Sequence, residues 1–350
     1  SLSLSLSLSL SLSLSLSVFL SFSLSLGGAR GGVGWGCGCL GGCGVVRFGG
    51  LAGIAIIGLI LWPCLATASG VYQWRDAQGR LHFGDQPPEG HGEDLSSRYQ
   101  QALPFDIVIE GVDYAVSPAL RDRLATAVRR LFSIYRHDLG IDYSREREFR
   151  IRIHGTEASF RRYQRQVAPN LENAAGFYHA GSNQITTWAI PDERALLALI
   201  THECAHAIAA ANPHRIPAWL DEGLAEYFEL MELHGLSADI PLNPHWLRVL
   251  RQHGYPQHGG RLATLMRAPY PQWYAANGPN HLSYAASWSL VWYLMDSREG
   301  RQLLSTLLRT PHPQPSSSEH VIERHWPGGM AALEQQWQSW LLRAQGKHRY

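Results

Sequence analysis

Apolar residues dominate the run from Ala195 to Ala211, which carries only a few ionisable side chains among its Ala, Leu and Ile positions. Its length and composition predict a buried helix rather than a strand. A second apolar stretch, from Trp219 to Tyr227, follows after a loop that contains two prolines, and it predicts another helix. The chain therefore places two apolar helices in succession, each with histidines or carboxylates in its interior.

Shorter patterns predict the elements around these two helices. Alternating apolar and polar positions predict strands, and helical spacing predicts further helices. The predicted strands are 105–110, 148–154, 174–179 and 183–188, the last two joined as a hairpin, and the predicted helices are 118–139, 157–165, 281–295 and 333–343. We therefore expect an α+β domain over residues 105–345, with a mixed sheet first and a mostly helical C-terminal half.

The first 68 residues differ from the rest in composition. Residues 1–50 pass from a Ser-Leu alternation into a Gly- and Cys-rich stretch, which predicts a low-complexity leader or a segment ahead of the true start. Residues 51–68 are uncharged and apolar, follow Arg47, and end in Ala66-Thr67-Ala68. This arrangement is typical of a secretory signal peptide cleaved after Ala68, although the same span is long enough to be an uncleaved membrane anchor.

Export would leave a chain with a single cysteine. Four of the five cysteines precede residue 69, so cleavage would leave only Cys204, which we interpret as a small core residue rather than a ligand. The whole chain has 30 basic and 29 acidic residues. This balance gives no electrostatic footprint for nucleic acid, and contact with a membrane is expected only through the N-terminal segment if it stays uncleaved.

Residues 69–100 are predicted to form a small β-hairpin module with a linker. Two short aromatic stretches, at 71–75 and 80–84, flank a turn around Gly79. The pattern Y-x-W-x-D-x-x-G-x-x-H-x-x-D-x-P-P, which begins at Tyr72, resembles a small domain of unknown function that follows the signal peptide in many secreted proteobacterial proteins. That resemblance also implies export, to the periplasm or beyond the cell.

The first long apolar helix contains His202-Glu203-x-x-His206, an H-E-x-x-H motif. Residues four apart lie on one face of a helix, so the two histidines can point at one metal ion, and the Glu203 carboxylate, beside that face, can reach a water bound to the ion. A catalytic zinc site needs a third protein ligand. Glu222 on the following helix is the candidate, and Glu226, four residues later, is expected to orient a ligand imidazole. The alternative is that both histidines are core residues and the glutamates form a solvated helix face.

The pairing of this motif with Trp219-Leu220-Asp221-Glu222-Gly223-Leu224-Ala225 resembles the gluzincin metallopeptidases, and in particular the peptidase-MA-like domains of bacterial envelope proteins. The resemblance implies a zincin-like fold that binds one Zn²⁺ ion through His202, His206 and Glu222, with Glu203 as the general base. It further implies that the strand before the zinc helix is the edge strand that pairs with a peptide substrate. The substrate-binding residues expected on this basis are Gln184, Thr186 and Trp188.

A tyrosine is also expected near the ion, because hydrolysis of a peptide bond builds negative charge on the carbonyl oxygen. Gluzincin aminopeptidases place such a tyrosine at the start of a helix some sixty residues beyond the glutamate ligand. By that resemblance Tyr284 is the candidate catalytic donor, and a buried core tyrosine is the alternative. His281, Tyr178 and His179 are lesser candidates.

The sequence thus predicts a secreted or periplasmic zinc metallopeptidase that acts on peptides or proteins. The G-x-M-E-N-type motif with which aminopeptidases bind a free amine is absent before His202, which favours an endopeptidase. A second hypothesis from another class is a zinc-containing envelope module that binds peptides or cell-wall polymers without cutting them. A purely structural zinc site is less favoured, because three ligands leave one position open.

Overall fold

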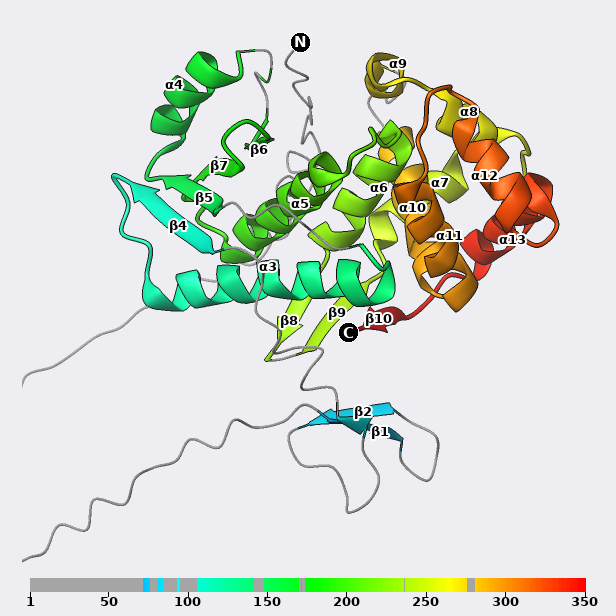
Figure 1. Ribbon diagram of the computed structural model, residues 1–350, viewed down its shortest axis with the longest axis horizontal. Coiled ribbons are helices and arrows are strands. Elements are labelled where there is room, and N and C mark those ends of the chain that lie inside the picture. The colour runs from blue at the N-terminus through cyan, green and yellow to red at the C-terminus, as the bar shows by residue number, and fades with distance from the viewer. Residues whose placement is uncertain are drawn as a thin grey trace, which may run out of the picture.

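The structure is a computed structural model that describes residues 72–75, 81–84 and 93–94 as strands and, further on, residues 106–141, 148–169, 171, 174–235, 237–275 and 281–350. Within these residues the predicted α+β fold is confirmed: a mixed sheet lies beside a mostly helical half (Figure 1). The predictions for residues 1–68 lie outside the described residues. None of the described helices combines the length and the apolar character that crossing a membrane requires.

The predicted N-terminal hairpin is present. Strand β1 (Tyr72–Arg75) pairs antiparallel with β2 (Leu81–Gly84), in a register that sets Trp74 opposite His82. A two-residue strand, β3 (Glu93–Asp94), pairs with the other side of β1. The sequence predicted only a linker at β3, because a two-residue strand has no periodicity to detect.

Four strands form the central sheet in the order β4-β5-β7-β6. Strands β4 (Ile107–Val112), β5 (Phe149–His154) and β7 (Gln184–Trp188) run parallel, and β6 (Gly176–His179) is antiparallel to β7. Helix α3 (Pro118–Asp138) makes the crossover between the first two strands. Ser117 caps this helix by accepting from the Leu120 amide at 3.2 Å.

The two faces of the sheet are covered by different helices. Side chains of a strand alternate between the two faces of the sheet. Tyr178 and Ile185 lie on the face that joins the large core cluster with α3 and α5 (Glu193–Ala211), whereas Phe177 lies on the opposite face. On that other face, Phe177 packs with Phe160 of α4 (Glu157–Val167), their ring centroids 6.0 Å apart. The sheet therefore presents one face to the helical half and closes the other with α4.

The assignment of Gln184–Trp188 as an edge strand is wrong. This segment is β7, which pairs with β5 on one side and with β6 on the other, so its backbone is not open to a peptide. Gln184 and Thr186 are buried and bond to each other, with Nε2 to Oγ1 at 2.8 Å. Among the described strands, the edge of the sheet on this side is β6. The two strands of a hairpin look alike in sequence, and only the pairing with β5 decides which of them is internal.

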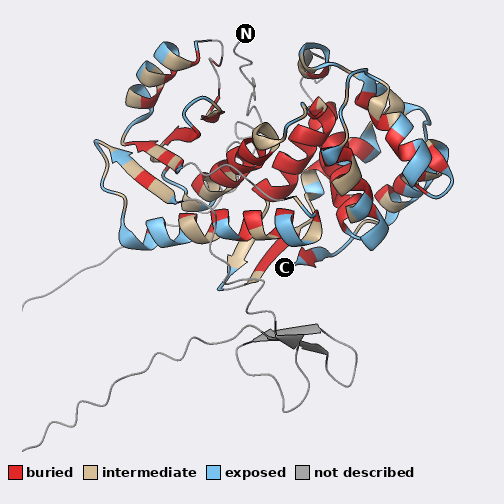
Figure 2. Ribbon diagram, in the orientation of Figure 1, coloured by how far each residue is buried: buried red, intermediate tan, exposed pale blue. Residues whose placement is uncertain are grey.

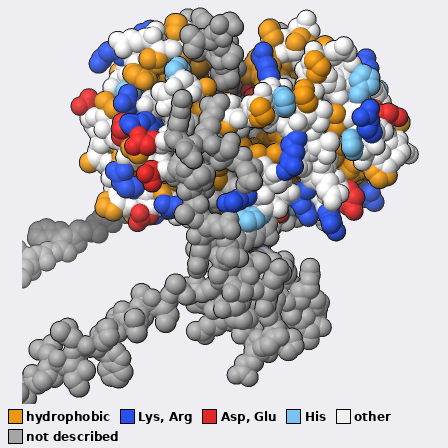
Figure 3. All heavy atoms as spheres, viewed as in Figure 1, with side chains coloured by type: hydrophobic (Ala, Val, Ile, Leu, Met, Phe, Trp, Pro, Cys, Tyr) orange, Lys and Arg blue, Asp and Glu red, His pale blue; other side chains and the backbone are white. Residues whose placement is uncertain are grey.

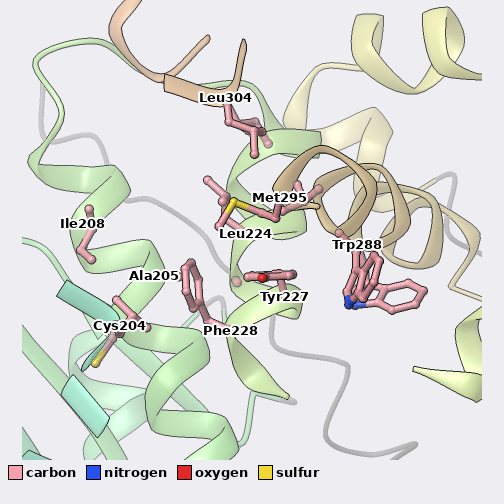
Figure 4. Packing of buried hydrophobic residues seen from close by; sticks show 14 of the residues in the cluster. Cys204, Ala205, Ile208, Leu224, Tyr227, Phe228, Trp288, Met295 and Leu304 are labelled. Atoms are coloured by element: carbon pink, nitrogen blue, oxygen red, sulfur yellow. The ribbon is translucent and has the colours of Figure 1, made fainter. Parts of the chain in front are cut away.

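Three helices form the centre of the helical half. Helix α6 (Ala218–Glu229) packs against α5 (Glu193–Ala211) and against α10 (Leu282–Met295), and every one of its residues is buried. Figure 2 shows these helices as the most buried part of the fold. Figure 4 shows how α5, α6, α10 and α11 (Arg298–Arg309) meet, with Cys204 fully buried on α5 as expected for a core residue.

The remaining elements surround this centre and complete the domain. Their bounds are α7 (Pro244–Gln252), α8 (Arg261–Arg267), α9 (Tyr270–Ala275), α11 (Arg298–Arg309), α12 (Ser317–His325), α13 (Gly329–Arg343), β8 (Glu232–His234), β9 (Ser237–Pro241) and β10 (Lys347–Arg349). The last three strands form a small antiparallel sheet in the order β10-β9-β8. The sequence did not predict this sheet, since its strands are only three to five residues long.

The small sheet ties the chain near residue 350 to α6. The Tyr227 hydroxyl on α6 lies 2.7 Å from His348 Nδ1 and 2.6 Å from the Tyr350 hydroxyl. On β9, buried Asp239 accepts from Arg349 Nε at 2.9 Å and from Lys347 Nζ. Burial alone would raise the pKa of Asp239, but the hydrogen bonds and charges of Arg349 and Lys347 outweigh it and lower this pKa.

On the face seen in Figure 3, basic and acidic side chains alternate over β4 and β5 and do not form a patch of one sign. Arg150 pairs there with Glu110, Nη1 to Oε1 at 2.9 Å, and with Glu148. These pairs are partly exposed, so each contributes at most about 1 kcal/mol.

Gly223 allows α6 to approach α10 closely, and replacing it should separate the two helices. A Cβ at this position would lie 2.8 Å from the Ser287 carbonyl oxygen and 2.9 Å from Val291 Cγ2, and the backbone oxygen cannot move aside. Gly223→Ala should therefore destabilise the fold by about 1–3 kcal/mol, despite the better helix propensity of alanine. Thermal unfolding measures this loss. Gly259→Ala is the control, because nothing lies within 4 Å of its Cβ, and equal stability of both variants would contradict the packing argument.

Asp239→Asn should change how stability depends on pH. A lowered pKa in the folded state stabilises the fold above the unfolded pKa of about 3.9, and this contribution is lost as the pH falls through the folded value. The variant should therefore be less stable at pH 7, by on the order of 1 kcal/mol because Lys347 and Arg349 are half exposed. Urea unfolding at pH 7 and pH 3 should show the difference shrinking at the lower pH. A constant difference would show that Asp239 acts through packing alone.

Candidate metal centre

Helices α5 and α6 bring two imidazoles and one carboxylate to a single point. The Nε2 atoms of His202 and His206 lie 3.2 Å apart, and Oε2 of Glu222 lies 3.9 and 3.8 Å from them respectively. All three side chains are buried, and together they could hold a metal ion. The structure thus brings together the three ligands expected from the sequence.

The other nitrogen of each imidazole is held by a carboxylate. His202 Nδ1 lies 3.0 Å from Oε2 of Glu229, and His206 Nδ1 lies 2.8 Å from Oδ1 of Asp221. An ionised carboxylate only accepts, so each Nδ1 carries the hydrogen and donates it. In the neutral imidazoles this leaves two Nε2 lone pairs facing each other, which is the arrangement that carboxylate–histidine–metal sites use.

Two facing lone pairs need a positive charge between them. Burial lowers the pKa of His206, but Asp221 and Glu222 raise it more, to about 10. Burial likewise lowers the pKa of His202, but the hydrogen bond and charge of Glu229, together with the charge of Glu203, raise it to about 9. The surrounding carboxylates therefore favour a cation at this point, either protons on the imidazoles or a metal ion.

The donor geometry fits a metal ion. Two nitrogen ligands about 2.0–2.1 Å from a tetrahedral Zn²⁺ ion lie roughly 3.3 Å apart, and the observed spacing is 3.2 Å. Oε2 of Glu222 is buried and has no hydrogen-bond partner among the described residues. Burial raises the pKa of Glu222, and the charges of His206 and His202 oppose this shift. A buried acceptor that no described residue donates to needs another positive partner, and the position of Oε2 beside the two Nε2 atoms fits the role of a metal ligand.

Glu203 lies beside this cluster without being part of it. The side chain is fully buried, and neither carboxylate oxygen has a hydrogen-bond partner of normal geometry in the described part of the chain. Burial raises its pKa, while the charges of His206 and His202, and then the backbone amide of Tyr178, lower it. Tyr178 is on β6, so Glu203 lies between the two histidines and the edge of the sheet.

Glu226 does not have the role expected for it. The carboxylates on the two Nδ1 atoms belong to Glu229 and Asp221, whereas Oε2 of Glu226 accepts from Trp246 Nε1 at 3.2 Å. Burial, and next the charge of Glu229, raises the pKa of Glu226 to about 8. Glu226 is therefore a buried neighbour of the centre and not the group that orients an imidazole.

The structure places Tyr284 at the start of α10, fully buried and close to the centre. Its ring packs edge-on against Trp273 with centroids 4.7 Å apart. Burial raises the pKa of its hydroxyl, followed by the charges of Glu222, Glu226, Glu203 and Glu229 in that order. The phenol therefore stays protonated near the carboxylates, as a hydrogen-bond donor would have to.

The lesser candidates His281, Tyr178 and His179 lie in three different surroundings. His281 caps α10 in a left-handed conformation, φ 49°, with its ring 6.1 Å from that of Tyr284. The Tyr178 hydroxyl donates to Asn183 Oδ1 at 3.0 Å, away from the centre. His179 is bonded to Ser182 at the exposed hairpin turn.

Helix α9 supplies two tyrosines that the sequence did not single out. The Tyr274 hydroxyl donates to Oε1 of Glu222 at 2.5 Å, and the Tyr270 hydroxyl donates to Oδ2 of Asp221 at 2.7 Å. The pKa of Tyr274 is raised, first by burial and then by the charge of Glu222. In sequence both tyrosines fall in a Pro- and Gly-rich region, and their spacing of four was the only available signal.

A cavity of about 640 Å³ is lined by residues of α3, of the first half of α5 and of the segment that ends α6 and follows it. Glu229, which holds His202, is one of the lining residues. Neither Glu203 nor the three candidate ligands nor any residue of β6 lines it. The cavity therefore does not expose Glu203 to a substrate.

Two families match parts of the chain. The profile of a protein of unknown function, DUF1570, matches residues 196–315, which run from the first turn of α5 through α6 and α10 to the segment after α11. The profile of a domain of unknown function, DUF4124, matches residues 58–103, which include the hairpin. The resemblance of the hairpin to a small domain of unknown function is thus confirmed. A comparison with curated proteins finds no match.

Removing Glu229 should weaken metal binding, because its carboxylate fixes the orientation and basicity of His202. Groups that hold ligand histidines in this way typically contribute 10–100-fold in metal affinity. We expect that loss in Glu229→Ala, measured by competition with a chromophoric chelator. Glu226→Gln is the control, since Glu226 bonds to Trp246 and not to an imidazole. An equal loss in both variants would contradict the assignment of Glu229.

Proposed function

We propose that the protein is a zinc-dependent peptidase whose ion is held by His202, His206 and Glu222. The observation that carries the proposal is the convergence of two buried Nε2 atoms and a carboxylate oxygen that has no hydrogen-bond partner among the described residues, with Glu203 beside them. Two nitrogens and one oxygen form the ligand set of catalytic zinc sites, which keep a fourth position open. The motif and the helix order that resemble gluzincins agree with this ligand set.

When bound, Zn²⁺ would act as a Lewis acid and lower the pKa of water from about 16 to about 7. The chain itself would supply the proton transfers. Glu203, a buried carboxylate beside the two histidines, would accept a proton from the attacking water and later deliver it to the leaving amine. Its burial favours this role, because a raised pKa brings a carboxylate closer to that of the groups with which it exchanges protons.

Two phenols are available to stabilise the negative charge that develops on the carbonyl oxygen. Tyr284 is the donor expected from the resemblance, and it is kept protonated by burial and by the charge of Glu222. Tyr274 is already bonded to Glu222 and is therefore less free to donate elsewhere. We accordingly assign oxyanion stabilisation to Tyr284.

The substrate would be an extended peptide that adds to β6. This strand is the edge of the sheet among the described strands, and the Tyr178 amide on it faces Glu203. A peptide that pairs with an exposed strand edge gains main-chain hydrogen bonds and is held straight. Pairing at β6 would therefore lay a scissile bond beside the general base. We further propose that the enzyme is an endopeptidase, since the aminopeptidase motif is absent before His202, and that it acts in the cell envelope, since the N-terminal sequence is typical of an exported protein.

One observation favours the alternative of a zinc-containing module that binds peptides or cell-wall polymers without hydrolysis. His202, Glu203 and Glu222 have no exposed surface, so a substrate reaches them only if the surrounding elements move. Turnover with and without a chelator separates the two functions, because a binding module would retain its ligand and produce no cleavage.

Glu203→Gln should abolish hydrolysis and leave metal binding intact. The amide keeps the shape of the side chain but cannot accept the proton, and loss of a general base typically costs about 10²–10⁴-fold in rate. The assay is cleavage of a mixed peptide library by the metal-loaded full chain, with zinc content measured on the same sample.

Glu232→Gln is the matched control, because Glu232 is partly exposed and pairs with Arg194 on the surface. It should cleave at the rate of the unsubstituted protein. Unimpaired turnover by Glu203→Gln would refute its role as the base, and cleavage that survives chelation would refute the zinc mechanism.

A further inference from the structure

The ligand carboxylate and the residue before it are both held by one short helix. Tyr274 bonds to Oε1 of Glu222, and Tyr270 bonds to Oδ2 of Asp221 and, at 3.2 Å, to the carbonyl oxygen of Ile216. Residues four apart lie on one face of a helix, so α9 presents both hydroxyls to the start of α6. Two neighbouring carboxylates, one a metal ligand and one the support of His206, therefore receive hydrogen bonds from the same element.

Helix α9 is itself fixed in place. Trp273, between the two tyrosines, is fully buried and packs edge-on against Tyr284. The guanidinium of Arg215 lies 4.5 Å from the centroid of the Tyr270 ring. Anchored on both sides, the helix holds its hydroxyls at defined positions, so the bonds to Glu222 and Asp221 are directed.

The bond from Tyr274 makes the two oxygens of Glu222 unequal. Oε1 is engaged by the phenol at 2.5 Å, while Oε2 is buried, has no hydrogen-bond partner among the described residues and faces the two Nε2 atoms. A carboxylate with both oxygens available can bind a metal ion through both and fill a further coordination position. With one oxygen held by a phenol, only the other is left for the ion.

We propose that Tyr274 is a positioning residue that restricts Glu222 to one-oxygen coordination and so keeps a coordination position open for the reactants. Tyr270 has a different role on the same helix: it holds Asp221 against His206 and thereby strengthens binding without changing the number of ligand atoms. This inference rests on the metal site of the proposed function, and it adds residues that act through the ligands and not on the substrate.

The test uses the full chain with Co²⁺ in place of zinc, because the visible absorption of Co²⁺ weakens as its coordination number rises. Tyr274→Phe removes one hydroxyl and should lower the absorption intensity, as Glu222 becomes free to bind through both oxygens. Tyr270→Phe should leave the intensity unchanged and weaken metal affinity about 10-fold or more. Tyr293→Phe is the matched control, since Tyr293 bonds only to Gln336 among the residues described, at 3.3 Å, and should change neither quantity.

The outcomes separate this inference from the proposed function. An unchanged Co²⁺ spectrum in Tyr274→Phe would overturn the positioning role, even if the metal-free variant unfolds at a lower temperature, because a merely structural bond affects stability alone. If the unsubstituted protein binds Co²⁺ and cleaves no peptide, the peptidase proposal fails while the spectra still decide the role of Tyr274. If the unsubstituted protein binds no metal, both fail.

Discussion

The candidate metal centre depends on the two hydrogen bonds that orient the imidazoles of His202 and His206. Because Glu229 and Asp221 accept from the Nδ1 atoms, neutral His202 and His206 direct their Nε2 lone pairs at each other across 3.2 Å inside the buried core. That arrangement is unfavourable unless a cation lies between them. The rest of the fold can be understood as the structure needed to hold such a cluster together.

Helix α6 supplies most of the groups that hold this cluster together. It carries the candidate ligand Glu222 together with Asp221 and Glu229, the two carboxylates that hold the imidazoles, and all of its residues are buried between α5, α10 and the elements around them. Gly223 lets α10 approach within contact distance at the position next to the ligand. The side chains of α6 thus serve packing and electrostatics at once, so the apolar neighbours fix the ligand geometry as firmly as the polar ones do.

Local spacing was sufficient to predict the elements and three side chains of the cluster. The i, i+4 relation of His202 and His206 follows from helix geometry alone, and helices α3 to α6, α10 and α13 and the strands of the central sheet follow from local patterns. The partners of the imidazoles depend on how α5 and α6 cross, which no local pattern encodes. Glu226 shares a face with Glu222, yet the carboxylate that reaches His202 is Glu229, one turn further along. The edge strand was misassigned for the same reason, because the position of β7 in the sheet depends on its pairing with distant β5.

The contact of α6 with β10 has a consequence for how the chain folds. Tyr227, five residues after Glu222, is bonded to His348 and Tyr350, more than 120 residues further along. Contacts of such long sequence separation form slowly, since a large loop must close first. The two hydrogen bonds that tie the second helix of the cluster to the small sheet can therefore form only after the ribosome has added residues 348–350, later than the packing of α6 on α5 and α10 becomes possible.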